Sequence, residues 1–165
     1  MKTIYLVRHA KSSWKEMGMK DEERPLNHRG KHDAPFMGKL LKKMKVTPDL
    51  IVTSPALRAL TTAKIFAEEL DYPAKKIEVD RSIYMADAAE LFDYVNELDD
   101  DIDSVMIFGH NPGHTYFLNT ISGESIDNMP TCSIAGVEFD VEKWNQIKKT
   151  TGKLKFFEYP KKYFQ

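Results

Sequence analysis

The chain has 165 residues, of which 42% are hydrophobic and 30% are charged, and its net charge is -1. These values are typical of a soluble globular protein, so we expect residues 1–165 to form a single domain. The N-terminus lacks a basic region followed by an apolar stretch, so we expect a cytoplasmic protein, and no feature of the sequence indicates more than a monomer. The balanced charge gives no reason to expect a nucleic-acid or membrane partner, and no apolar run approaches the length of a membrane span. With one cysteine, Cys132, no intrachain disulfide is possible.

Strand patterns alternate with helix patterns along most of the chain. In chain order we predict strand 2–7, helix 28–45, strand 50–53, helix 55–70, strand 77–79, helix 87–98, strand 104–108, helix 112–122, and strands 133–141 and 153–157. This alternation predicts a three-layer α/β/α fold with a mainly parallel central sheet, and the C-terminal strands are expected to add an antiparallel edge. In the first helix, Lys39, Lys42, Lys43 and Lys45 form a basic cluster with the spacing of a solvent-facing side.

The dipeptide Arg8-His9 stands where the first predicted strand ends. In α/β sheets, ligands bind at the carboxyl ends of the strands. An arginine holds phosphate oxygens bidentately, and a histidine can accept a phosphoryl group covalently. The pair therefore indicates phosphate chemistry at this edge of the sheet.

Three predicted helix starts point to the same chemistry. Asn27 is a candidate cap, and Ser54-Pro55 and Asn111-Pro112 both have the sequence of a capped helix that opens with proline. Helix N-termini attract anions through their free N–H groups and their dipole. The functional side chains beside these starts are Arg24, Arg58 and His110. Together with the first pair, they predict one anion pocket with three arginines and two histidines.

Six groups of residues in fixed order carry a resemblance to a known family. They are RHAKSSW at 8–14, RPLN at 24–27 with RG at 29–30, DAP at 33–35, SPALRA at 54–59 with TA at 62–63, GHNPG at 109–113, and TCSIA at 131–135. Over residues 3 to about 140 the chain resembles the histidine phosphatase superfamily, and within it the SixA-like phosphohistidine phosphatases. The resemblance implies that His9 is the nucleophile, that Arg8, Arg58 and His110 hold the phosphoryl group, and that Arg24 is a further clamp.

The chemistry requires a neutral His9 with one bare ring nitrogen. Nearby guanidinium charges lower the pKa of an imidazole, and a fixed acceptor on the other nitrogen, which the sequence does not identify, would set the tautomer. Arginines here replace the magnesium ion of other phosphoryl-transfer enzymes, so we expect neither a metal nor another cofactor. We also expect Asn27 and Asn111 to bind substrate.

A proton donor for the leaving group is harder to identify. Many members of the superfamily have an acidic residue after the third strand, but no carboxylate stands immediately before Ile83-Tyr84. Asp80 is the nearest candidate for a general acid and Asp87 the next, although both also fit a cap or a turn. Without an acid, an alkyl ester is a poor substrate, whereas the nitrogen of phosphohistidine can be protonated from solvent.

We therefore predict a phosphohistidine phosphatase that acts on another protein and releases inorganic phosphate. Two alternatives stay open: a general phosphomonoesterase for small molecules, and a phosphate-binding module without catalysis. His28 and His32 have metal-ligand spacing but lack the glutamate of an HExxH motif, and Pro112 separates His110 from His114 near a helix start, so both pairs are interpreted as non-metal residues. Cys132 is interpreted as a core thiol. Trp14 either lines the rim of the pocket or only pins its loop.

Overall fold

The computed structural model describes residues 1–14 and 18–164. Within these residues, six strands form one sheet in the order β3-β2-β4-β1-β5-β6. The strands are β1 (Lys2–Arg8), β2 (Leu50–Thr53), β3 (Glu78–Val79), β4 (Ser104–Gly109), β5 (Ile134–Phe139) and β6 (Lys153–Glu158). The first four strands pair in parallel, and β5 and β6 pair antiparallel at one edge. The predicted mainly parallel sheet with an antiparallel C-terminal edge is confirmed.

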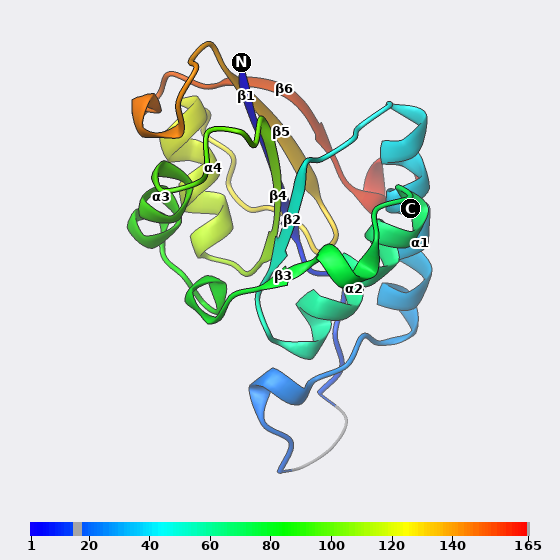
Figure 1. Cartoon of the computed structure of the whole chain (residues 1–165). Coiled ribbons are helices and arrows are strands. Elements are labelled where there is room, and N and C mark those ends of the chain that lie inside the picture. The colour runs from blue at the N-terminus through cyan, green and yellow to red at the C-terminus, as the bar shows by residue number, and fades with distance from the viewer. Residues whose placement is uncertain (15–17, 165) are drawn as a thin grey trace.

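Helices cover both faces of the sheet (Figure 1). They are α1 (His28–Lys43), α2 (Leu57–Glu69), α3 (Ala88–Asn96) and α4 (Gly113–Ser122). Side chains that alternate along the central strands divide between two cores. Leu6 and Ile107 pack with α3 and α4, whereas Val7 and Phe108 pack with α1 and α2. The three-layer α/β/α fold is therefore confirmed, and burial on both faces explains the unbroken apolar runs of β1 and β4.

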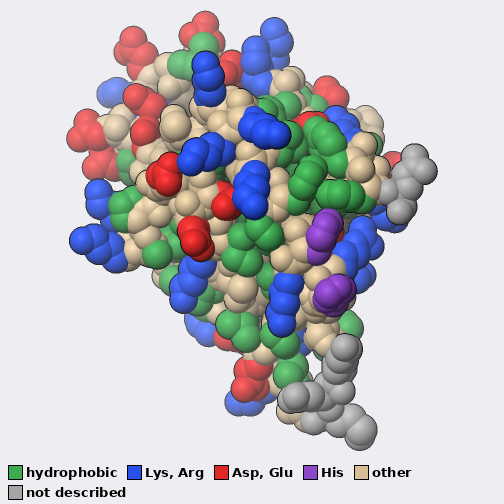
Figure 2. Space-filling model, turned by 90° about the vertical axis from the view of Figure 1, so that its right-hand side faces the viewer, with side chains coloured by type: hydrophobic (Ala, Val, Ile, Leu, Met, Phe, Trp, Pro, Cys, Tyr) green, Lys and Arg blue, Asp and Glu red, His purple; other side chains and the backbone are tan. Residues whose placement is uncertain are grey.

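The solvent side of α1 agrees with the sequence pattern. Lys39, Lys42 and Lys43 are exposed, and Leu41 is fully buried. On the side of the molecule that Figure 2 shows, Lys and Arg side chains are interspersed with apolar and polar atoms. None of the helices in residues 1–14 and 18–164 combines the length and apolar character needed to cross a membrane.

Three helices begin later than predicted, and for α3 the difference is one residue, since Asp87 is its N-cap. Helix α2 starts at Leu57, with Ala56 as its N-cap, because Ser54 Oγ instead accepts from Ala56 N (3.1 Å) and forms a turn before the helix. Helix α4 starts at Gly113, so Pro112 is its N-cap rather than its first residue. The predicted cap of α1 is confirmed, since Asn27 Oδ1 accepts from Gly30 N at 2.9 Å.

The strand register brings the ends of β1, β4 and β2 to one edge of the sheet. Arg8 pairs with Gly109, and Phe108 pairs with Thr53. The residues that immediately follow these strands, His9, His110 and Ser54, consequently meet at the carboxyl edge.

Candidate active site

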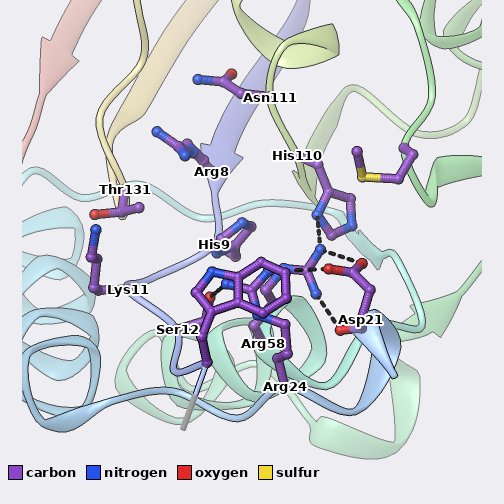
Figure 3. Close-up of a pocket in the computed structure, with 12 residues that line it drawn as sticks. Arg8, His9, Lys11, Ser12, Asp21, Arg24, Arg58, His110, Asn111 and Thr131 are labelled. Carbon is purple, nitrogen blue, oxygen red and sulfur yellow. Dashed lines mark hydrogen bonds and ion pairs between the residues drawn. The ribbon is translucent and has the colours of Figure 1, made fainter. Parts of the chain in front are cut away.

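A pocket of about 420 Å³ opens at this edge (Figure 3). Its ionisable lining side chains are Arg8, Lys11, Arg24, Arg58, Asp21, His9 and His110, and its other lining residues are Ser12, Trp14, Met85, Asn111 and Thr131. The structure thus brings together the three arginines and two histidines that the sequence placed in one pocket. Among the described residues, four cations against one carboxylate make the lining strongly positive, as an anion site requires.

His9 is held in one orientation by the backbone. Its amide donates to Gly109 O (3.1 Å), and its ring Nδ1 lies 2.8 Å from Ala10 O. A carbonyl can only accept, so Nδ1 carries the hydrogen and Nε2 is bare in the neutral ring. Burial lowers the pKa of His9 to about 3, and the charges of Arg58 and Arg8 push it in the same direction. Ala10 O is therefore the acceptor that the sequence could not identify.

His110 is also neutral and sits beside His9, with ring centroids 5.3 Å apart. Its Nδ1 accepts from Arg58 Nη2 (3.3 Å), so its Nε2 carries the hydrogen and donates to Ser54 Oγ at 2.8 Å. Burial holds the pKa of His110 well below its usual range, and the neighbouring His9 and Arg58 add to the effect. Ser54 thus has a role in the site as the partner of His110.

Arg58 and Arg8, two of the arginines that line the pocket, each keep one donor unpaired within the described part of the chain. Arg58 is 3% exposed and donates to Asp21 O (2.7 Å) and Asp21 Oδ2 (2.9 Å). Arg8 donates through Nη1 to Met129 O (2.8 Å). Among the described residues, the buried Nε atoms of both guanidinium groups have no hydrogen-bond partner. Buried cations with incomplete acceptors favour an incoming oxyanion.

Asp21 is the functional side chain that sequence reasoning missed. It begins a short 3-10 helix, Asp21–Glu23, in the loop between β1 and α1. Its carboxylate accepts from Tyr84 OH (2.6 Å), Arg58 Nη2 (2.9 Å) and Arg24 Nη1 (3.0 Å). Although burial opposes its ionisation, these hydrogen bonds hold the pKa of Asp21 well below its usual range. The carboxyl group is therefore ionised, and the only sequence signal for it is its place three residues before Arg24.

Arg24 lines the pocket from the same loop. Its Nε donates to Ser13 O (3.2 Å) and its Nη2 to Ser12 Oγ (2.6 Å). The indole of Trp14 covers one face of the guanidinium, whose central carbon lies 3.3 Å from the ring centroid. Trp14 thus both lines the pocket and packs on Arg24.

Asn111 lines the pocket, but its side chain forms hydrogen bonds with the neighbouring loop and with α4. Its Nδ2 donates to Asn128 Oδ1 (2.8 Å) and Met129 O (3.0 Å), and its Oδ1 accepts from Thr115 Oγ1 (2.8 Å). Since Met129 O is also the acceptor of Arg8, Asn111 acts on the site by fixing that carbonyl.

Three predicted site residues, Asn27, Asp80 and Asp87, lie outside the lining of this pocket. Asn27 caps α1 through its side chain. Asp80 Oδ1 accepts from the backbone N (2.9 Å) and Oγ (2.7 Å) of Ser82, which makes it the cap of a short 3-10 helix. Asp87 likewise caps α3 through Glu90 N (2.8 Å). In each case the side chain satisfies free N–H groups of a helix start, a local role that competes with catalysis.

The structure also places the residues that the sequence offered as a thiol nucleophile or as metal ligands. Cys132 is buried, and burial raises the pKa of its thiol, as expected of a core residue. His114 is buried beneath the site with its Nε2 on Ile107 O (3.1 Å). Within residues 1–14 and 18–164, no cluster of three His, Cys, Asp or Glu side chains is arranged to bind a metal ion.

Sequence comparison matches residues 4–88 to the histidine phosphatase superfamily, branch 1. An uncharacterized chloroplastic protein of Arabidopsis thaliana is 28% identical over 157 residues, which cover 90% of this chain and 72% of that protein. Phosphoglycerate mutase 1 of Saccharomyces cerevisiae is 40% identical over 75 residues, and the match spans 43% of this chain but only 30% of the yeast enzyme.

Solved structures match nearly the whole chain. SixA from Agrobacterium tumefaciens superimposes with a TM-score of 0.83 at 26% identity, over 96% of this chain and 98% of that one. The protein histidine phosphatase SixA in complex with tungstate gives a TM-score of 0.82 at 24% identity, over 97% and 98% of the two chains.

Proposed function

The chain belongs to the histidine phosphatase superfamily, and from this premise we propose that it hydrolyses the phosphorus–nitrogen bond of phosphohistidine on another protein. One observation carries the proposal: a neutral His9, with Nε2 bare, lines a pocket in which Asp21, the one carboxylate that lines it among residues 1–14 and 18–164, is ionised. The bare Nε2 of His9 supports a covalent phosphoryl acceptor, and the ionised Asp21 supports a leaving group that needs no proton from an acid of the enzyme.

In the proposed first step, Arg8 and Arg58 bind the phosphoryl oxygens and Nε2 of His9 attacks phosphorus. A new phosphorus–nitrogen bond forms on His9 as the bond to the substrate imidazole breaks, and solvent supplies the proton that the departing nitrogen takes. Because Nδ1 keeps its hydrogen and donates it to Ala10 O, the developing imidazolium is oriented and stabilised throughout.

In the second step, water attacks the phosphorus of phosphorylated His9. The phosphorus–nitrogen bond breaks, inorganic phosphate leaves, and the ring returns to its neutral form. His110 and Asp21 support both steps by contacting Arg58 from two sides. Guanidinium groups supply the charge stabilisation in this scheme, so we propose that the reaction runs without a metal ion.

The charge state of Asp21 favours a phosphorus–nitrogen bond over an alkyl phosphoester. An alkoxide leaving group needs a proton in the transition state, and an acid whose pKa lies well below its usual range cannot donate one efficiently near neutral pH. Asp80 and Asp87 are engaged as caps outside the lining. The nitrogen of phosphohistidine is basic enough to be protonated by water first.

The proposal is tested by comparing four substrates: a phosphohistidine peptide, phosphoramidate, an aryl phosphate and a sugar phosphate, each with and without EDTA. We expect kcat/KM to be highest for the two phosphorus–nitrogen compounds and unchanged by EDTA. His9→Ala should be inactive, and His28→Ala, which removes an exposed histidine outside the pocket, should behave as wild type.

Three results would count against the proposal. Preference for the sugar phosphate would favour the general phosphomonoesterase, and loss of activity in EDTA would contradict a metal-free reaction. Phosphate binding without turnover of any of the four compounds would favour the binding module.

A further inference from the structure

Trp14 has one ring face packed and the other face open. Its side chain is 71% exposed, although the indole is the largest apolar group in the pocket lining. The packed face lies on Arg24, with 3.3 Å between the guanidinium carbon and the ring centroid. An exposed tryptophan that contributes nothing to the core, at the mouth of a charged pocket, is typical of a ligand contact.

The surface beneath the indole is fixed. Arg24 is 9% exposed, and its three nitrogens donate to Ser13 O (3.2 Å), Asp21 Oδ1 (3.0 Å) and Ser12 Oγ (2.6 Å). A guanidinium held at three points cannot turn away from the ring, so the stack orients the indole. The open face is therefore presented in a defined position at little entropic cost on binding.

The position of Trp14 relative to the chemistry decides what it can contact. In phosphoryl transfer the leaving group lies roughly in line with the nucleophile, on the far side of phosphorus. With the phosphoryl group held between Arg8 and Arg58 over His9, the leaving group projects toward the mouth of the pocket. Trp14 and Met85, which is 50% exposed, are the apolar lining residues there, and they come from different loops.

We propose that the open face of Trp14 stacks on a planar heteroaromatic leaving group, such as the imidazole of phosphohistidine, and thereby sets substrate preference. The inference rests on the proposed phosphoryl transfer to His9 and adds a specificity-determining contact to it. A flat ring matches the indole face and retains the stack on Arg24, whereas an ammonia or alkyl leaving group has no face to offer.

The test uses two substrates that share the bond and differ only in the ring. Phosphoimidazole and phosphoramidate both have a phosphorus–nitrogen bond, but only the first has a planar leaving group. In Trp14→Ala, we expect kcat/KM for phosphoimidazole to fall about threefold to tenfold more than kcat/KM for phosphoramidate. Trp14→Phe should restore most of this ratio.

A matched control separates the stacking contact from general damage. Tyr116 is a 63% exposed aromatic residue of α4 outside the pocket lining, so Tyr116→Ala should leave both rates and their ratio unchanged. If Trp14→Ala lowers the two rates equally, Trp14 acts only by supporting Arg24 and the proposal is overturned.

Failure of the inference can be told apart from failure of the proposed function. If the wild type hydrolyses esters but not phosphorus–nitrogen compounds, the bond assignment is wrong. The stacking contact is then tested by the ratio of kcat/KM for phenyl phosphate to kcat/KM for methyl phosphate, which Trp14→Ala should lower. The inactive His9→Ala variant should bind phosphoimidazole more tightly than phosphoramidate. Adding Trp14→Ala to this variant should remove the difference between the two dissociation constants. A ratio insensitive to Trp14 in that background would also overturn the inference.

Discussion

Replacing Asp21 by Asn should tighten the binding of inorganic phosphate and at the same time slow turnover. The carboxylate accepts from Arg58 Nη2 (2.9 Å), Arg24 Nη1 (3.0 Å) and Tyr84 OH (2.6 Å). The side chain of Asn has the same shape but only one accepting oxygen. Its NH₂ group would therefore face one of these donors, with which it cannot form a hydrogen bond. The variant therefore loses an ionic partner of both guanidinium groups and one of their hydrogen bonds.

The magnitude follows from the charge and exposure of this group. Without the carboxylate, the formal charge of the pocket lining rises from +3 to +4. The Asp21 side chain is 38% exposed, so its interaction lies between an exposed ion pair, worth up to about 1 kcal/mol, and a buried charged hydrogen bond, worth about 1.5–3 kcal/mol. A net gain of about 1 kcal/mol for the phosphate anion corresponds to about fivefold tighter binding.

Turnover should fall because Arg58 is no longer held in one orientation. We expect kcat to drop about tenfold and KM to drop with it, the pattern of a variant that binds anions better but positions them worse. Phosphate inhibition constants and steady-state rates measure both effects. Glu22→Gln is the matched control, since it breaks the Glu22–Arg81 ion pair (2.9 Å) on the same short helix without touching the pocket. Weaker phosphate binding, or unchanged phosphate binding with unchanged kcat, would refute the reasoning.

Three further predictions concern protonation and packing. Because burial lowers the pKa of His9 to about 3, its ring should stay neutral as the pH falls from 8 to 5, and imidazole nitrogen shifts that titrate near 6.5 would contradict this. Burial also lowers the pKa of His114 to about 4, so below pH 6.5 the unfolded chain binds a proton that the folded chain rejects and stability is lost as the pH falls. Between pH 6.5 and 5 the wild type should lose about 1.5 kcal/mol more than His114→Gln in urea unfolding, and an equal loss in both proteins would argue against it. Finally, a Cβ at Gly113 would lie 1.9 Å from Ala86 O, so Gly113→Ala should lower the unfolding free energy by about 2 kcal/mol, whereas an unchanged thermal midpoint would show that the start of α4 moves freely.

The fold and the meeting of the site residues could be predicted because both follow from strand ends. Apolar runs identified β1 and β4, and parallel pairing brings the residues after them to one edge, as the Arg8–Gly109 pair shows. The neighbouring positions of His9 and His110 could therefore be predicted without knowing the structure of any loop.

Loop residues could not be predicted in the same way. Asp21 enters the pocket only because its short helix is held against Tyr84 and Arg58, contacts between segments more than 30 residues apart that leave no local pattern. Asn27 and Asp80 were predicted as site residues because each is a polar residue near a site motif. The structure shows that both side chains instead accept from backbone N–H groups at helix starts, which the sequence motif alone does not reveal. The acceptor for His9 is a backbone carbonyl, which every residue has.

Trapping the phosphoenzyme tests the central claim most directly. The protein is mixed briefly with radiolabelled phosphoramidate, quenched in alkali, digested and analysed by mass spectrometry. We predict an alkali-stable, acid-labile phosphoryl group on the peptide that contains His9, at a level that His28→Ala retains and His9→Ala lacks. A phosphoryl group on any other residue, or undiminished turnover by His9→Ala, would contradict the assignment of His9 as the nucleophile.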